Sequence, residues 1–254
     1  MNTSNQSKHE FAFYIEDISS ICKSLSQGDE LHIDNKQLFH RIENIVRLKP
    51  GESYTLFDRL EHIKLCLTGT KKKRDVIGSI LQKEKNERLK PNITFILPLL
   101  KREHFEHALY SLVELGAQTI QPIMVQKSQK KWDTQRTYAR YINIMITAAE
   151  QSKTFAFAHL NHPIKLEALC AKLHAEEKKI FFDPNGQNLY QTIEKIKSSS
   201  YDKIVLMIGP EGDLLEDEKK FLRDNNFIFC KLTPTILRSF QAATVGLGAF
   251  RSLL

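Results

Sequence analysis

Two turns near the carboxyl end of the chain, each directly after a hydrophobic strand, constrain the fold most. The segment predicts a strand, a turn, a helix, a second strand and a second turn at residues 203–207, 208–212, 214–225, 227–231 and 232–238. In an open α/β sheet, ligands bind at the carboxyl ends of the strands, where such turns lie. The pattern therefore predicts that the two turns meet in space and together enclose a ligand.

The chain changes character at the polar, charged segment 83–91. Before it we expect short strands in series around one helix, a pattern that favours a small β-barrel. The expected strands are 11–15, 30–33, 53–58, 62–68 and 75–81, and the helix is 35–48. After it, strands alternate with helices, which is typical of a mostly parallel sheet covered on both faces. The expected strands are 92–97, 119–125 and 179–182, and the helices are 102–115, 133–151, 163–175 and 189–197. We therefore expect two domains, residues 1–88 and 89–254.

The last helix, expected over residues 238–254, contains Gly246 and Gly248. Each glycine costs a helix about 1 kcal/mol relative to alanine. Close approach of another backbone, from a chain crossing or a partner subunit, is the simplest compensation.

Composition places the chain among ordinary globular proteins. Of its 254 residues 41% are hydrophobic and 26% charged, and no apolar run approaches membrane-spanning length. Residues 1–10 are polar and lack the apolar core of a secretory signal, so we expect a cytoplasmic protein with no membrane partner. The four cysteines are scattered without a CxxC pair, so we expect reduced thiols and no metal site.

The net charge of +7 raises the expectation of a polyanionic partner. Basic residues gather in two blocks, although such runs are often only a solvated face. The first contains Lys71, Lys72, Lys73 and Arg74 with Lys83, Lys85, Arg88 and Lys90, and the second contains Lys127, Lys130, Lys131, Arg136 and Arg140.

The first turn is suited to a neutral or cationic ligand. Gly209 and Gly212 let a backbone come close to a ligand, because glycine has no side chain. Glu211 and Glu218 are expected at the start of the following helix, where they would repel a phosphate. An ordinary strand-to-helix turn is the alternative.

The second turn combines apolar side chains with one cation. Leu232, Thr233, Ile236 and Leu237 could enclose a flat ring such as adenine. Arg238 follows, with a rigid fork of donors suited to phosphate or carboxylate. A surface arginine that pairs locally is the alternative.

Taken together, the motifs resemble the bacterial 16S ribosomal RNA uridine-N3 methyltransferases of the SPOUT superfamily. The resemblance rests on residues 205–212 with Glu218, on 232–238, and on upstream motifs at 46–51, 56–58, 114–116, 120–122 and 148–152. It implies an α/β chain: a small PUA-like β-barrel that holds RNA, then a SPOUT domain with a deep carboxyl-terminal trefoil knot. It also implies S-adenosylmethionine as cofactor, a homodimer, no metal, and 16S ribosomal RNA or the 30S subunit as partner.

The resemblance also implies roles for residues. Arg238 would contact phosphate or developing charge, and Glu211 would assist proton removal or hold its loop. The cofactor-binding residues would be Phe182, Ile208, Gly209, Gly212, Leu232, Thr233, Ile236 and Leu237. The RNA-binding residues would be Arg41, Arg47, Lys71, Lys72, Lys73, Arg74 and Lys127.

The chain departs from the family pattern beside the second turn. The family usually has Arg-x-Glu-Thr-Ala there, whereas this chain has Phe240 and Gln241 in place of the acid and hydroxyl. Two alternatives therefore stay open: a knotted methyltransferase with another RNA target, and a catalytically impaired RNA-binding homologue.

Overall fold

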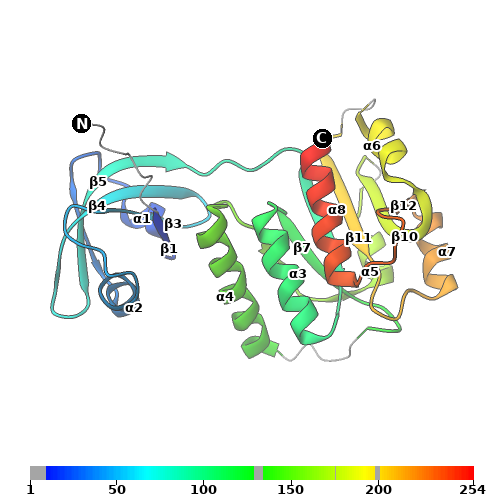
Figure 1. Cartoon of the computed structure of the whole chain (residues 1–254), viewed down its shortest axis with the longest axis horizontal. Helices are drawn as coiled ribbons and strands as arrows, with labels where there is room; N and C mark the ends of the chain where they lie inside the picture. The colour runs from blue at the N-terminus through cyan, green and yellow to red at the C-terminus, as the bar shows by residue number, and fades with distance from the viewer. Residues whose placement is uncertain (1–9, 129–133, 175, 198–200) are drawn as a thin grey trace. The chain divides into compact units, whose positions relative to one another are not determined.

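The computed structural model describes residues 10–128, 134–174, 176–197 and 201–254. The chain forms two compact units, Met1–Glu87 and Arg88–Leu254 (Figure 1). Lys130 and Lys131 of the second basic block lie outside the described residues.

The first unit is built on a five-stranded sheet with the order β1-β3-β4-β5-β2. The strands are β1 (Phe11–Tyr14), β2 (Glu30–Asp34), β3 (Ser53–Phe57), β4 (Glu61–Lys71) and β5 (Asp75–Lys85). β1 pairs in parallel with β3, and the other ladders are antiparallel. Ile63, Leu65 and Leu67 all face the core, as their alternation predicts.

Helical segments close one side of this core. They are α1 (Ile18–Ile21), α2 (Lys36–His40) and the π-helix η1 (Arg41–Val46), so the helix expected at 35–48 is confirmed with a change of winding. The side chain of Asn35 caps α2 by accepting hydrogen bonds from Gln37 N and Leu38 N, both at 2.9 Å.

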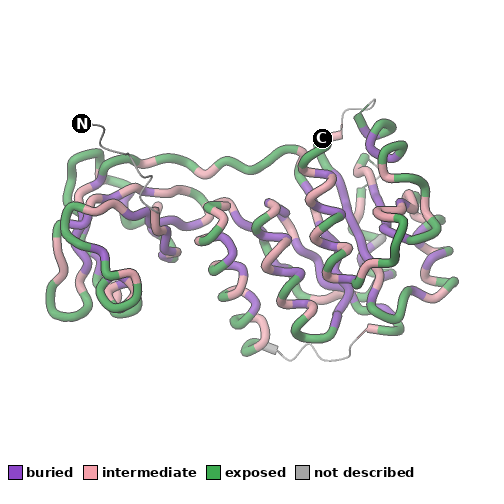
Figure 2. Tube along the Cα trace, viewed as in Figure 1, coloured by how far each residue is buried: buried purple, intermediate pink, exposed green. Residues whose placement is uncertain are grey.

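The second unit has a seven-stranded sheet in which every ladder is parallel. The order is β12-β10-β11-β6-β7-β8, with β9 also on β7. The strands are β6 (Asn92–Pro98), β7 (Thr119–Met124), β8 (His159–Leu160), β9 (Ile164–Lys165), β10 (Lys178–Asn188), β11 (Lys203–Ile208) and β12 (Ile228–Lys231). The central strand β11 is buried over almost all of its length (Figure 2).

Helices pack on both faces of this sheet, which confirms the expected α/β architecture. They are α3 (Arg102–Glu114), α4 (Thr134–Ser152), α5 (Leu166–Cys170), α6 (Leu189–Lys197), α7 (Glu216–Asp224) and α8 (Ser239–Leu253). α3 packs between α4 and α8, and α8 also contacts β11. Side chains of α5 and α7 pack with Val205 and Met207. These two side chains share one face of β11, because alternate residues of a strand point to the same side.

Two predicted helices of the second unit differ from the structure. The helix expected at 163–175 is only the five residues of α5, because Ile164 and Lys165 pair with β7 instead. α7 begins at Glu216, so Glu211 precedes the helix, while Glu218 lies in its first turn as expected. Leu215 has extended backbone angles, φ −71° and ψ 157°, so the helix expected from residue 214 starts two residues later.

Glycines mark two close approaches around β10. A Cβ on Gly186 would lie 2.4 Å from the backbone nitrogen of Cys230, so only glycine lets this loop pass along β12. A Cβ on Gly246 would lie 2.4 Å from the ring of Phe182. The compensation for that helical glycine is therefore an aromatic ring, not the backbone expected from the sequence.

No helix within the described ranges is long and apolar enough to cross a membrane. Cys22 and Cys230 are buried and Cys66 is half-buried, and all three are free thiols.

We predict that Gly246→Ala destabilises the protein by about 1–3 kcal/mol, because the new methyl group overpacks against the buried Phe182 ring. Gly248→Ala is the matched control: its Cβ would meet only Leu115, at 3.8 Å. The control should be neutral, or stabilising by up to about 1 kcal/mol through helix propensity. Urea unfolding of both variants measures the difference, and equal stabilities would contradict the assigned contact.

Candidate functional site

A cavity of about 540 Å³ opens at the carboxyl ends of β10, β11 and β12. Phe182 ends the regular part of β10, Ile208 ends β11, and the second turn follows β12. Gly209 from the first turn and Leu237 from the second both line this cavity. The two turns therefore meet in space, because parallel pairing brings their strands to one edge.

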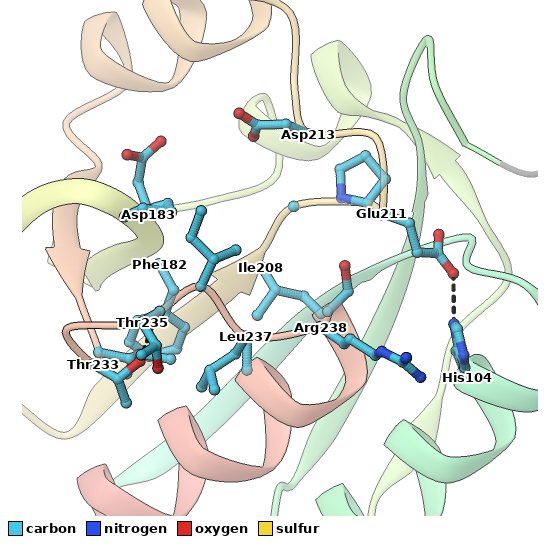
Figure 3. A pocket seen from close by; sticks show the side chains of 17 residues that line it. His104, Phe182, Asp183, Ile208, Glu211, Asp213, Thr233, Thr235, Leu237 and Arg238 are labelled. Carbon is cyan, nitrogen blue, oxygen red and sulfur yellow. Dashed lines mark hydrogen bonds and ion pairs between the residues drawn. The ribbon is translucent and has the colours of Figure 1, made fainter.

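Most residues expected to bind a cofactor lie at this cavity. Those that line it are Phe182, Ile208, Gly209, Leu232, Thr233, Ile236 and Leu237, together with Glu211 and Arg238 (Figure 3). Gly212 does not line it: its carbonyl oxygen accepts a hydrogen bond from Lys127 Nζ at 2.8 Å. Lys127 thus supports the first turn through its ammonium group.

The second turn offers unpaired groups to a ligand. The side chain of Ile236 is unusually open for an apolar residue, at 83% exposure. Within the described residues, the backbone N–H groups of Thr235, Ile236 and Leu237 donate no hydrogen bond. An apolar surface beside free backbone donors is suited to a ring with polar edge atoms.

Glu211 joins the first turn to the start of α3. Its Oε1 accepts hydrogen bonds from Lys101 N and from His104 Nδ1, each at 3.0 Å. Burial favours the neutral acid, but the bonds from His104 and Lys101 outweigh it and hold the pKa of Glu211 below its ordinary value of 4.5. Glu211 is therefore an ionised side chain whose Oε1 joins the first turn to the start of α3.

A buried lysine connects the ends of β10 and β11. Lys219 Nζ lies 3.0 Å from Asp183 Oδ2 and 2.7 Å from Asp213 Oδ2. Burial lowers the pKa of Lys219, but the two carboxylates outweigh it and raise that pKa above 10.5. The sequence missed this contact, because Lys219 belongs to the charged run at 216–220 and such a run predicts an exposed helix face. Asp183 had a usable signal: it directly follows a strand, as Gly209 does.

Arg238 has the conformation of a helix N-cap at the start of α8, with its side chain exposed. No ion pair or hydrogen bond engages its guanidinium among the residues that the structure describes. The side chain extends toward His104 and Glu211 (Figure 3). The local pairing considered as an alternative is therefore not what holds it.

Most residues expected to bind RNA belong to the first unit. Lys71, Lys72, Lys73 and Arg74 form the exposed turn between β4 and β5. Arg74 pairs with Asp34, and the guanidinium of Arg41 lies 4.7 Å from the centre of the Phe13 ring. Lys72, Lys73 and Arg47 have φ values of 50°, 55° and 59°. That left-handed conformation is uncommon for residues other than glycine, asparagine and aspartate.

The described residues contain no group of three His, Cys, Asp or Glu side chains that could hold a metal ion. The carboxylates at the cavity are instead held by Lys219, His104 and backbone N–H groups.

We predict that Lys219→Met lowers the free energy of unfolding by about 3 kcal/mol, because it leaves the buried carboxylate of Asp183 without its cation. Asp213→Asn is the control, since the Asp213 side chain is 56% exposed and such a pair contributes about 1 kcal/mol or less. Urea denaturation compares the two. A Lys219→Met variant as stable as its control would contradict the buried ion pair.

Comparison with known proteins agrees with this arrangement. The chain is 24% identical over 224 residues to Ribosomal RNA small subunit methyltransferase E of Mycobacterium bovis, covering 85% of this chain and 84% of that protein. It is 25% identical over 236 residues to Ribosomal RNA small subunit methyltransferase E 2 of Borreliella burgdorferi, covering 89% and 93%.

A similar solved structure is Ribosomal RNA small subunit methyltransferase E from Neisseria gonorrhoeae bound to S-adenosyl methionine. It superposes with a TM-score of 0.81 at 25% identity, over 96% of this chain and 98% of that one. The profile of the RNA methyltransferase domain family matches residues 87–251. The chain therefore belongs to the RNA methyltransferase domain family.

Proposed function

We propose that this chain is an S-adenosylmethionine-dependent methyltransferase that modifies N3 of a uridine in 16S ribosomal RNA. One observation carries the proposal: the two turns of an RNA methyltransferase family member jointly line one cavity, with Arg238 unpaired beside it. The relatives act on small-subunit ribosomal RNA by name, and one was crystallised with this donor. A ribosomal RNA substrate implies a cytoplasmic location for the protein.

The residues at the cavity fit such a donor. Phe182, Ile208 and Leu237 provide apolar walls for an adenine ring, and the free backbone donors of the second turn suit its edge. Glu211, Asp183 and Asp213 place carboxylates around a ligand that carries positive charge. When bound, the donor supplies a methyl group on a positively charged sulfur.

The protein's own residues have two tasks in this reaction. They hold the uracil nitrogen in line with the methyl group, and they stabilise the negative charge that develops on the ring. Arg238 is suited to the second task, because its guanidinium is unpaired and close to the cavity. Glu211 is suited to positioning, since both of its hydrogen bonds hold the start of α3.

The resemblance also implies a trefoil knot, and the strand order supports it. β12 lies at the sheet edge beyond β10, whereas α8, which follows β12 in the chain, packs on β11 and α3. Residues 232–238 must therefore cross back over the end of β10, near the loop at Gly186. A trefoil knot results if an earlier loop of the chain encircles this crossing segment, as the resemblance implies.

We also propose that the first unit is a PUA-like barrel that binds RNA. The β4–β5 pairing shifts register twice, and such bulges bend a sheet toward closure. Its exposed turn at Lys71–Arg74 holds two lysines in strained backbone conformations, a cost expected at functional sites. Arg41 and Arg47 extend the basic surface, and Lys127 is a further candidate in the second unit.

We also propose that two copies of the chain form a homodimer, with the outer side of α8 as part of the interface. Val245 and Leu253 on this helix are 40% and 45% exposed, although both are apolar. A second copy of the chain is suited to cover them, as the resemblance implies.

The impaired-homologue alternative rests on Phe240 and Gln241, and the position of Phe240 supports the hypothesis of an active enzyme instead. The Phe240 side chain does not line the main cavity, but stacks on His104 with ring centres 4.9 Å apart. Phe240 therefore lies beside the cavity rather than among the residues that line it.

We predict that Arg238→Ala lowers methyl transfer to small-subunit RNA by about 100-fold or more, as expected for loss of one group that stabilises developing charge. Donor affinity measured by calorimetry should change little, because the apolar walls remain. Transfer is measured with labelled donor, and the modified nucleotide is mapped by mass spectrometry. Unchanged transfer would remove the role assigned to Arg238, and a modified base other than uridine would contradict the proposed target.

We predict a steep loss of RNA affinity with salt, because phosphate contacts release counterions. Changing Lys72 and Lys73 together to Gln should reduce the slope of log K against log salt by about 1.4, at about 0.7 per contact to single-stranded RNA. Changing Lys172 and Lys220 together to Gln is the control. Both side chains are exposed and lie outside the basic blocks, so this double variant loses the same charge. Equal slopes for the two double variants would contradict the proposed RNA surface.

A further inference from the structure

His104 lies in the first turn of α3 and lines the main cavity (Figure 3). Two contacts fix its ring. Nδ1 is 3.0 Å from Glu211 Oε1, and the ring face stacks on Phe240 at an interplanar angle of 29°. The imidazole is therefore held by a carboxylate at one edge and an aromatic ring on one face.

The Glu211 contact decides which ring nitrogen is free. Glu211 is ionised and can only accept, so Nδ1 of His104 carries the proton that is donated to it. In the neutral imidazole, Nε2 then has a lone pair. No described residue forms a hydrogen bond or ion pair with Nε2. His104 thus combines an oriented ring with an unused proton acceptor.

The other titratable groups that line the cavity are engaged or unsuited to accept a proton. Asp183 and Asp213 share the ammonium group of Lys219. Glu211 accepts two hydrogen bonds and its pKa is lowered, which makes it a weak base. Arg238 is a cation at any physiological pH. A histidine, by contrast, changes charge near neutral pH, the range in which general bases work best.

We infer that His104, oriented by Glu211, is the general base that takes the N3 proton of the target uridine. This inference rests on the proposed function. The N3–H bond breaks as its proton moves to Nε2, and the electron pair left on N3 forms the bond to the methyl carbon. The bond from that carbon to sulfur breaks, and its electron pair stays on sulfur as a neutral thioether. The imidazolium later releases the proton to water.

Two charged groups from neighbouring elements lie beside His104. Glu211, from the turn after β11, lies 3.0 Å from the Nδ1 of His104, and Arg238, from the start of α8, lines the same cavity. His107 lies one turn further along α3 and contacts Phe240, with the centres of these two rings 5.6 Å apart. Protonation of Nε2 removes the acceptor, so the rate should fall as the pH is lowered.

The test compares kcat across pH for wild type and His104→Gln. The variant keeps a donor for Glu211 but has no basic nitrogen, so kcat at pH 7 should fall by about 100-fold or more. Its rate should keep rising with pH, because hydroxide takes over the proton, whereas the wild-type rate should level off. Added imidazole should restore part of the rate to His104→Gly, which a purely structural role would not permit.

His107→Gln is the matched control, because His107 lies on the same helix and contacts the same Phe240 without touching Glu211 or the main cavity. It should keep wild-type kcat and pH dependence. Donor affinity of each variant, measured by calorimetry, checks that the cavity is intact.

The outcomes separate the two proposals. If wild type transfers methyl groups to uridine and His104→Gln keeps the same rate and pH profile, the inference about His104 is overturned alone. Loss of rate in His104→Gln without rescue of His104→Gly by imidazole also overturns it. A wild-type chain that binds the donor but methylates no RNA overturns the proposed function, and the inference with it.

Discussion

The parallel pairing of β10 with both β11 and β12 is the constraint on which the rest of the site depends. It brings three strand ends to one edge of the sheet, so that the turns after β11 and β12 enclose one cavity. The pairing tolerates no bulk where the segments approach most closely. The absence of a side chain at Gly186 leaves space for the backbone of Cys230, and its absence at Gly246 leaves space for the ring of Phe182. That ring lines the cavity on one side and packs on α8 on the other, so helix position and cavity shape are coupled.

Charged groups then hold the turns in place. Lys219 connects the end of β10 to the turn after β11 through Asp183 and Asp213, and Glu211 connects the same turn to the start of α3. These carboxylates are satisfied before any ligand arrives. Among the described residues, the unpaired groups at the cavity include the backbone donors of the second turn, the guanidinium of Arg238 and Nε2 of His104. The division is chemically sensible, because a site preorganised by satisfied groups need not rearrange when it binds.

Phe240 departs from the pattern that the family resemblance implies, and the structure gives its ring a defined contact. A phenylalanine at this position stacks on His104, which is itself hydrogen-bonded to Glu211. The aromatic contact on one face and the hydrogen bond at one edge together fix the orientation of the imidazole at the cavity. This residue was not singled out in the sequence, since a histidine in an amphipathic helix is ordinary.

The sequence by itself determined the elements with strong local signals. The parallel sheet, the end of α3 before Gly116 and the turns after β11 and β12 all follow from periodicity and turn chemistry. Seven of the eight expected cofactor-binding residues line the cavity for the same reason, since they follow strand ends; Gly212 is the exception. Tertiary structure alone decided that Lys219 is buried, that Glu211 bonds to the start of α3 rather than capping α7, and that His104 reaches the cavity. Those contacts join residues as far as 110 positions apart. They depend on the order of strands in the sheet, which no local pattern of side chains contains.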